Sequence, residues 1–145
     1  MNPSLKRIFY TLLPALVVAS GIVGCAEIRK LTYPKDFVYI EDKEVRSLMQ
    51  RMGSDVAQLE RLLVDASASD SVRKQEIITE LDDLERIALR LSGGHKQTNQ
   101  FVIGDHIEEF ISDISTAKTY ASIDPPNYSK ARGLTDSCQG CHQFR

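Results

Sequence analysis

Apolar residues recur at alternating intervals of three and four through most of the chain after Glu41, and this spacing restricts the fold more than any other feature. Such a period gathers the apolar side chains on one side of an α-helix, whereas a half-buried strand alternates every second residue. No segment shows strand alternation of any length. The spacing therefore predicts an all-α fold.

The pattern divides into four helices, of which the first starts at about Glu41. Ser67–Ser71 interrupts the pattern, and Asp70 or Ser71 can cap the second helix. The pair Gly93-Gly94 is typical of a helix end. The inward residues expected for these two helices are Val45, Leu48, Met49, Met52, Val56, Leu59 and Leu63, and then Ile77, Leu81, Leu84, Ala88 and Leu91.

A polar loop to about Gln100 precedes the third helix, which Pro125-Pro126 ends. The fourth helix is shorter and starts at about Asn127. The inward residues expected here are Ile103, Ile107, Phe110, Ile111, Ile114, Ala117 and Ala121, and then Ala131, Leu134, Cys138 and Cys141 or His142. Amphipathic helices joined by short loops pack naturally as an antiparallel four-helix bundle.

The last predicted helix contains Cys138-Gln139-Gly140-Cys141-His142. Two cysteines separated by two residues and followed by histidine form the attachment pattern of c-type haem. On a helical turn, Cys138 and Cys141 share one face and can each form a thioether with a haem vinyl group. His142 can then offer its imidazole to the iron. The motif predicts one covalent haem c with His142 as the proximal ligand.

The two cysteines have two other interpretations. A redox-active CxxC of the thioredoxin kind lies at a helix N-terminus and follows a strand, whereas Cys138 and Cys141 lie near the end of a helix. A structural zinc site needs four ligands, and Cys138, Cys141, His142 and the distant His106 form an unconvincing set. The haem interpretation is therefore favoured.

The N-terminal residues resemble an export signal. Lys6 and Arg7 precede an apolar run from Ile8 to Val23, and Ile22-Val23-Gly24-Cys25 resembles a bacterial lipobox. This pattern predicts a signal peptide over residues 1–24 and lipidation of Cys25. The alternative is an uncleaved membrane helix, since the run is near the lower limit for a span.

After the signal peptide, the chain is expected to consist of a lipidated tether over residues 25–40 and a four-helix domain over residues 41–145. The domain is expected at the periplasmic face of a bacterial membrane, because c-type haem is attached outside the inner membrane. Ala26 after the lipidated Cys25 favours the outer membrane over the inner one. All three cysteines are thereby assigned, and none is left for a structural disulfide.

Charge and motifs narrow the function further. Removing residues 1–24, with Lys6 and Arg7, leaves 16 basic and 20 acidic residues, a net charge of about −4. No basic cluster is present, so nucleic acid is not expected as a partner. The sequence also lacks a glycine-rich phosphate loop and an internal repeat. We therefore expect a carrier rather than an enzyme.

A four-helix chain with its haem motif in the last helix resembles the cytochrome c prime family, the class II c-type cytochromes. The resemblance covers the region from about Glu41 to Arg145. It rests on the Cys138–His142 motif and on Ala131-Arg132-Gly133-Leu134 before it. Family members carry an aromatic-basic pair after the histidine. Phe144-Arg145 matches this pair but lies one residue closer to His142 than in the family.

The resemblance implies that the distal side of the iron faces the first helix. Met49 falls on the family's ligand position and Met52 lies one turn later, so Met49 is the favoured distal ligand. The alternatives are that both methionines fill the core or that His106 completes a bis-histidine haem. Methionine ligation is typical of an electron carrier, because the soft sulfur favours ferrous iron.

Electron transfer between unidentified redox partners is accordingly the expected function. The alternative is a five-coordinate haem that binds a diatomic gas, NO or CO, for sensing or scavenging. A peroxidase-like activity ranks third, since the first helix offers only Arg46 and Arg51 near a distal site. A homodimer is left open as the oligomeric state.

Overall fold

The computed structural model describes residues 33–65 and 69–142, with only the backbone of Asp105 and of residues 139–141. The chain divides into two units, Met1–Lys35 and Asp36–Arg145, and the second contains all helices and strands described below. The expected signal peptide, Cys25, most of the tether and Phe144-Arg145 lie outside the described residues. The predictions for those segments therefore stay predictions.

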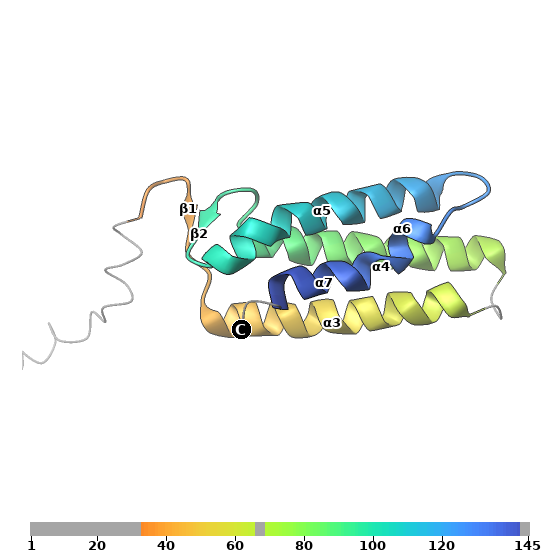
Figure 1. Cartoon of the computed structure of the whole chain (residues 1–145), viewed down its shortest axis with the longest axis horizontal. Helices are drawn as coiled ribbons and strands as arrows, with labels where there is room; N and C mark the ends of the chain where they lie inside the picture. The colour runs from red at the N-terminus through yellow and green to blue at the C-terminus, as the bar shows by residue number, and fades with distance from the viewer. Residues whose placement is uncertain (1–32, 66–68, 143–145) are drawn as a thin grey trace, which may run out of the picture. The chain divides into compact units, whose positions relative to one another are not determined.

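The second unit is built mainly from helices, which confirms the all-α prediction (Figure 1). The helices are α3 (Asp42–Val64), α4 (Asp70–Leu91), α5 (Phe101–Ser122), α6 (Ser129–Arg132) and α7 (Leu134–His142). Two short strands, β1 (Phe37–Val38) and β2 (Gln97–Thr98), pair in parallel.

The apolar stripes predicted from the sequence form one core. Leu59 of α3, Leu81 and Leu84 of α4, and Ile114 of α5 are at most 1% exposed. Four residues expected on the inner side, Val45, Met49, Ile103 and Cys138, are only partly buried and pack against the core. The three-and-four spacing therefore identified the inner side of α3, α4 and α5 correctly, whereas His142, one of the two alternatives for the end of the last stripe, is exposed.

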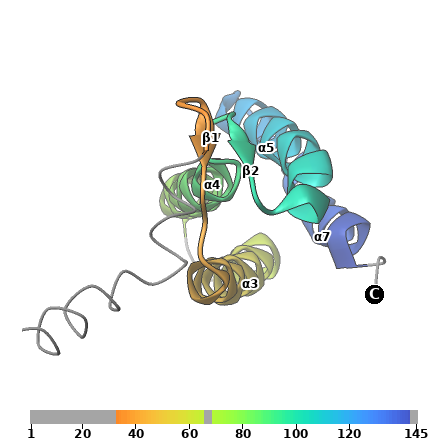
Figure 2. The same cartoon turned by 90° about the vertical axis from the view of Figure 1, so that its left-hand side faces the viewer.

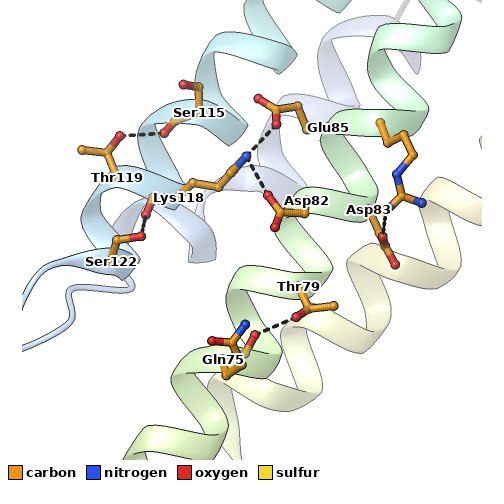
Figure 3. A network of polar contacts seen from close by, with 10 residues as sticks. Gln75, Thr79, Asp82, Asp83, Glu85, Ser115, Lys118, Thr119 and Ser122 are labelled. Atoms are coloured by element: carbon orange, nitrogen blue, oxygen red, sulfur yellow. Dashed lines mark hydrogen bonds and ion pairs between the residues drawn. The ribbon is translucent and has the colours of Figure 1, made fainter.

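Neighbouring helices pack in chain order, α3 on α4 and α4 on α5, and α5 packs on both α6 and α7. Figure 2 shows α3, α4, α5 and α7 seen along their axes. Arg90 near the end of α4 pairs with Glu44 near the start of α3 over 2.8 Å. Lys118 of α5 donates to Asp82 and Glu85 of α4 over 2.7 and 2.6 Å (Figure 3). These pairs join helices that run in opposite directions.

Helix α4 begins differently from the prediction. Its N-cap is Ser69, and Asp70 is already the first helical residue, so the capping role expected of Asp70 or Ser71 is wrong, by one position for Asp70 and by two for Ser71. Ser69 makes no side-chain capping bond, but its carbonyl accepts the first bond of the helix, from the N–H of Arg73 at 3.0 Å. The carboxylate of Asp70 instead pairs with Arg73 over 2.7 Å, within the first turn.

The end of α4 follows the prediction at Gly93-Gly94. Both glycines have positive φ, 61° at Gly93 and 69° at Gly94. A Cβ at Gly93 would lie 2.9 Å from Cγ2 of Thr98 and 3.0 Å from Cβ of Val38. Glycine is thus required at position 93 both for its backbone conformation and for the close approach of the two strands.

The two strands correct the expectation that the chain has none. Each has two residues, too few for an alternating pattern to be visible in the sequence. Next to them, Ile40 is 3% exposed, and its N–H donates to Oδ1 of Asn99 over 2.7 Å. The folded unit therefore starts at Asp36 and includes the last residues of the segment expected to be a tether.

The predicted fourth helix is in fact two, α6 and α7, separated at Gly133. The N–H of Gly133 donates to the carbonyl of Lys130, three residues earlier, over 3.2 Å. A bond to the third preceding residue tightens the last turn of α6 and redirects the chain. Ala131 and Leu134, on either side of the break, are both buried, as predicted.

Candidate functional site

Helix α7 carries the cysteine-histidine motif. Cys138 is half-buried and packs against the core, and its thiol lies 3.8 Å from the carbonyl oxygen of Leu134, to which it donates. His142, the last residue of α7, is exposed. The backbone of Cys141 belongs to α7, and its side chain lies outside the described residues.

The surroundings of Cys138 keep its thiol protonated. Burial raises the pKa of this thiol above its ordinary value, and the negative charge of Glu60 adds to the effect. A thiol in such a site is a poor nucleophile at neutral pH, because only the thiolate attacks.

Two contacts join the C-terminal segment to α3. The hydroxyl of Thr135 donates to Oε1 of Glu60 over 2.5 Å, and Nη2 of Arg132 donates to the carbonyl of Leu63 over 3.0 Å. Residue numbers rise along the C-terminal segment while they fall along α3. Helices α3 and α7 therefore run antiparallel from a register that the Thr135–Glu60 pair sets.

Continued over two turns of ideal helix, this register brings His142 level with Gly53 along the two helices. Each residue lies two helical turns beyond the Thr135–Glu60 pair, on the same side of its own helix as Thr135 or Glu60. The end of α7 is therefore level with a position of α3 that has no side chain. In Figure 1 the end of α7 overlaps the N-terminal half of α3, and Figure 2 shows that the two helices are separated there.

The stretch of α3 around Gly53 is open. A Cβ added to Gly53 would meet no atom of the described residues within 4 Å. The backbones of α5 and α7 approach each other closely, whereas α3 and α7 have few close backbone contacts in the described part of the chain. At Gly53, α3 is thus left uncovered by the described residues.

The two methionines of α3 have different surroundings. Met52 is 7% exposed and belongs to the core. Met49 is only half-buried and packs against the edge of the core. Because Met49 precedes Gly53 by four residues, it lies one turn away on the side of α3 that faces α7. Of the two sulfurs, that of Met49 is therefore beside the open stretch.

Helix α5 borders α7 on its other side. The hydroxyl of Ser137 donates to Oδ2 of Asp113 over 2.8 Å, which fixes α7 against α5. His106 is half-buried on α5, and it lies two turns from Asp113 on the same side of the helix. Sequence reasoning singled out neither Thr135, Glu60, Ser137 nor Asp113, because single polar residues on helix surfaces carry no pattern.

The structure tests the other site predictions less directly. In the residues that it describes, no three His, Cys, Asp or Glu side chains form a group able to hold a metal ion. No helix of the described ranges has both the length and the apolar character needed to cross a membrane. Cys25 and the side chain of Cys141 lie outside those ranges.

The chemistry of the donor set fits a covalent haem. Cys138 and Cys141 supply the thiols for two thioethers, His142 supplies a nitrogen ligand, and no described atom lies within 4 Å of a Cβ added at Gly53. Met49 lies at the edge of the open stretch around Gly53 as a second candidate ligand. Comparisons with protein-family models, with curated proteins and with solved structures find no match to this chain.

Proposed function

We propose that this chain is a c-type cytochrome, an antiparallel four-helix bundle that carries one haem c and transfers electrons. The proposal is supported by the Thr135–Glu60 contact, which brings His142 level with Gly53 along the two helices, and by the open space at Gly53, one turn from Met49. A haem between α3 and α7 explains why the described residues leave that face of α3 uncovered. It also explains the spacing of Cys138, Cys141 and His142.

The residues have separate roles in this proposal. Cys138 and Cys141 hold the haem by thioethers, and His142 binds the iron on the proximal side. When bound, the haem supplies a reversible one-electron couple. The apolar residues of the core keep water from one side of the site, and Cys138 at the edge of the core anchors the cofactor where α7 meets α5.

Electron transfer is favoured over gas binding by the position of Met49. A thioether at the edge of the open stretch can occupy the sixth coordination position, which leaves no site for a gas. Met52 is the less favoured ligand, because its side chain belongs to the core. With Met49 unligated, the same site suits a five-coordinate haem that binds NO or CO, which is the second candidate function.

The proposed location follows from the N-terminal residues. Lipidation of Cys25 would anchor the domain to the periplasmic face of a bacterial membrane, the outer one favoured by Ala26. An anchored carrier meets its redox partner proteins by diffusion along the membrane surface. A second copy of the chain is a further candidate partner, and nucleic acid is not expected.

Haem staining of a denaturing gel tests the cofactor. The protein is expressed with a c-type haem maturation system, and the polypeptide band should keep its peroxidase stain after boiling. Changing both Cys138 and Cys141 to serine should abolish the stain, whereas Cys25→Ser should keep it. A wild-type band without stain contradicts the proposal.

Near-infrared absorption of the ferric protein then separates the two functions. Ligation by Met49 predicts a methionine-to-iron charge-transfer band, which Met49→Leu should remove and Met52→Leu should leave. A high-spin ferric wild type whose ferrous form binds carbon monoxide at once would support the gas-binding function instead.

Membrane fractionation tests the anchor. The wild-type chain should fractionate with membranes, and Cys25→Ser should either release the domain or leave the precursor at full size. Unchanged fractionation together with unchanged size in Cys25→Ser contradicts lipidation at this position.

A further inference from the structure

Gly53 is a glycine in the interior of a long helix, where this residue is unfavourable. Helix α3 runs from Asp42 to Val64, so Gly53 lies near its middle. Glycine at such a position costs about 1 kcal/mol relative to alanine, because the flexible backbone must be ordered. Its φ is not positive, so no special backbone conformation requires glycine here.

Packing within the described residues does not require glycine at this position either. A Cβ at Gly53 would meet no described atom within 4 Å. Gly93 offers the contrast, since a Cβ there would come within 2.9 Å of Thr98. The described chain therefore gives no reason to keep a residue that weakens α3.

The reason lies in what Gly53 faces. Met49 precedes it by one turn and Glu60 follows it by two turns, all on the side of α3 that faces α7. The Thr135–Glu60 register brings His142 level with Gly53. A group bound by His142 would consequently lie against the backbone of α3 at Gly53.

We propose that Gly53 is a positioning residue for the haem. The missing side chain lets the bound haem lie close to α3, and this closeness brings the sulfur of Met49 within reach of the iron. The inference rests on the proposed function, because it concerns the fit of the haem and the strength of its distal ligand. A larger residue at position 53 should hold the haem away from α3 and weaken or break the bond to Met49.

Gly104 provides a matched control. It is also a glycine of a long helix, in the first turn of α5, it is exposed, and a Cβ there would likewise meet nothing described within 4 Å. Gly104 lies two and a half turns from Asp113, so it is on the side of α5 opposite to the side that contacts α7. Substitutions at Gly104 change helix propensity as those at Gly53 do, without adding bulk at the site.

The experiment compares Gly53→Ala, Gly53→Leu, Gly104→Ala and Gly104→Leu in the haem-loaded protein. Two quantities are measured, the near-infrared charge-transfer band and the dissociation constant of added imidazole, which competes with Met49 for ferric iron. Gly53→Leu should remove the band and tighten imidazole binding at least about tenfold, which corresponds to about 1.4 kcal/mol. Gly53→Ala should tighten it severalfold, and both Gly104 variants should stay within about twofold of the wild type.

The outcomes distinguish the inference from the proposed function. A wild-type protein without covalent haem overturns the proposed function itself. Two other results overturn the role of Gly53 alone. One is a haem-loaded wild type without the near-infrared charge-transfer band, and the other is a Gly53→Leu variant in which both the band and imidazole binding are unchanged. Gly53→Ala keeps the test decisive if the leucine variant does not fold, because the added methyl group meets no described atom.

Discussion

The hydroxyl of Thr135 in α7 lies 2.5 Å from Oε1 of Glu60 in α3, and this contact sets the register between the two helices. Residues that are unremarkable in the sequence thereby determine what His142 faces. A shift of one turn would place His142 beside Met49 or beside Ala57 instead of Gly53. The geometry of the proposed haem site thus depends on a pair outside the cysteine-histidine motif.

Removing this pair should loosen α7. Thr135→Val keeps the shape of the side chain and removes the hydrogen-bond donor, so the free energy of unfolding should fall by about 0.5–1.5 kcal/mol. The loss should lie near the lower end of this range because both side chains are exposed. Urea denaturation measures this change. The matched control is Thr119→Val, since Thr119 donates only to Ser115 of its own helix. A control that loses as much stability as Thr135→Val contradicts a role for the α3–α7 contact.

The sequence predicted the helices well because their pattern is long and regular. The stripe from Leu48 to Leu63 covers several turns, so single exceptions do not obscure it, and α3 starts within one residue of the expected Glu41. Strands β1 and β2 could not be found in this way, because two residues cannot show a period. They form where Gly93 lets β2 approach Val38, which is a tertiary effect.

The candidate site was predictable only in part. The motif identified Cys138, Cys141 and His142 from their spacing, and the resemblance ranked Met49 ahead of Met52. The role of Gly53 was missed, because a lone glycine within a helical pattern has no signature of its own. It becomes visible only when the Thr135–Glu60 contact aligns α3 with α7. The break at Gly133 was missed for a similar reason, since the apolar spacing continues across it.

Met49 and Met52 should differ in their contribution to folding. Met52 is 7% exposed within the core, so Met52→Ala should lower the free energy of unfolding of the haem-free protein by about 2–5 kcal/mol. Met49→Ala should cost clearly less, because its half-buried side chain leaves a smaller cavity. Chemical denaturation of both variants checks the order. Equal losses, or a larger loss for Met49→Ala, would show that the two side chains are packed differently from this description.

An acidic cluster between α3 and α4 should make stability depend on pH. Burial raises the pKa of Asp55, and the charge of Asp83 adds to it, while Arg51 and Arg86 oppose the shift. Burial likewise raises the pKa of Glu80, with Asp55 and Asp83 adding. Carboxyl groups with a raised pKa bind protons more readily in the folded chain than in the unfolded one. The folded chain therefore loses stability as the pH rises from the pKa of an unfolded carboxyl group, about 4, through the raised pKa of the folded state.

Replacing Asp55 with asparagine tests this effect. Asp55→Asn should be more stable than the wild type at neutral pH, and the difference should shrink as the pH falls below about 4, where the wild-type carboxyl is protonated as well. Urea denaturation across this pH range measures the difference, with Asp124→Asn in the exposed loop before α6 as the control. A stability gain that is the same at every pH contradicts a titration of Asp55.

Cys138 should react slowly with alkylating reagents in the folded, haem-free protein. Burial raises the pKa of its thiol, and the nearby charge of Glu60 raises it further, so little thiolate is present at neutral pH. A chain with Cys25→Ser and Cys141→Ser leaves Cys138 as the single cysteine, and its reaction with iodoacetamide can be followed at a series of pH values. The rate should be well below that of the urea-unfolded chain and should rise only at a pH above the ordinary thiol value of about 8.5. Adding Glu60→Gln should move the profile toward lower pH by less than unfolding does, because burial is the larger cause. Equal rates in the folded and unfolded chains would mean that α7 does not cover Cys138 in the haem-free protein.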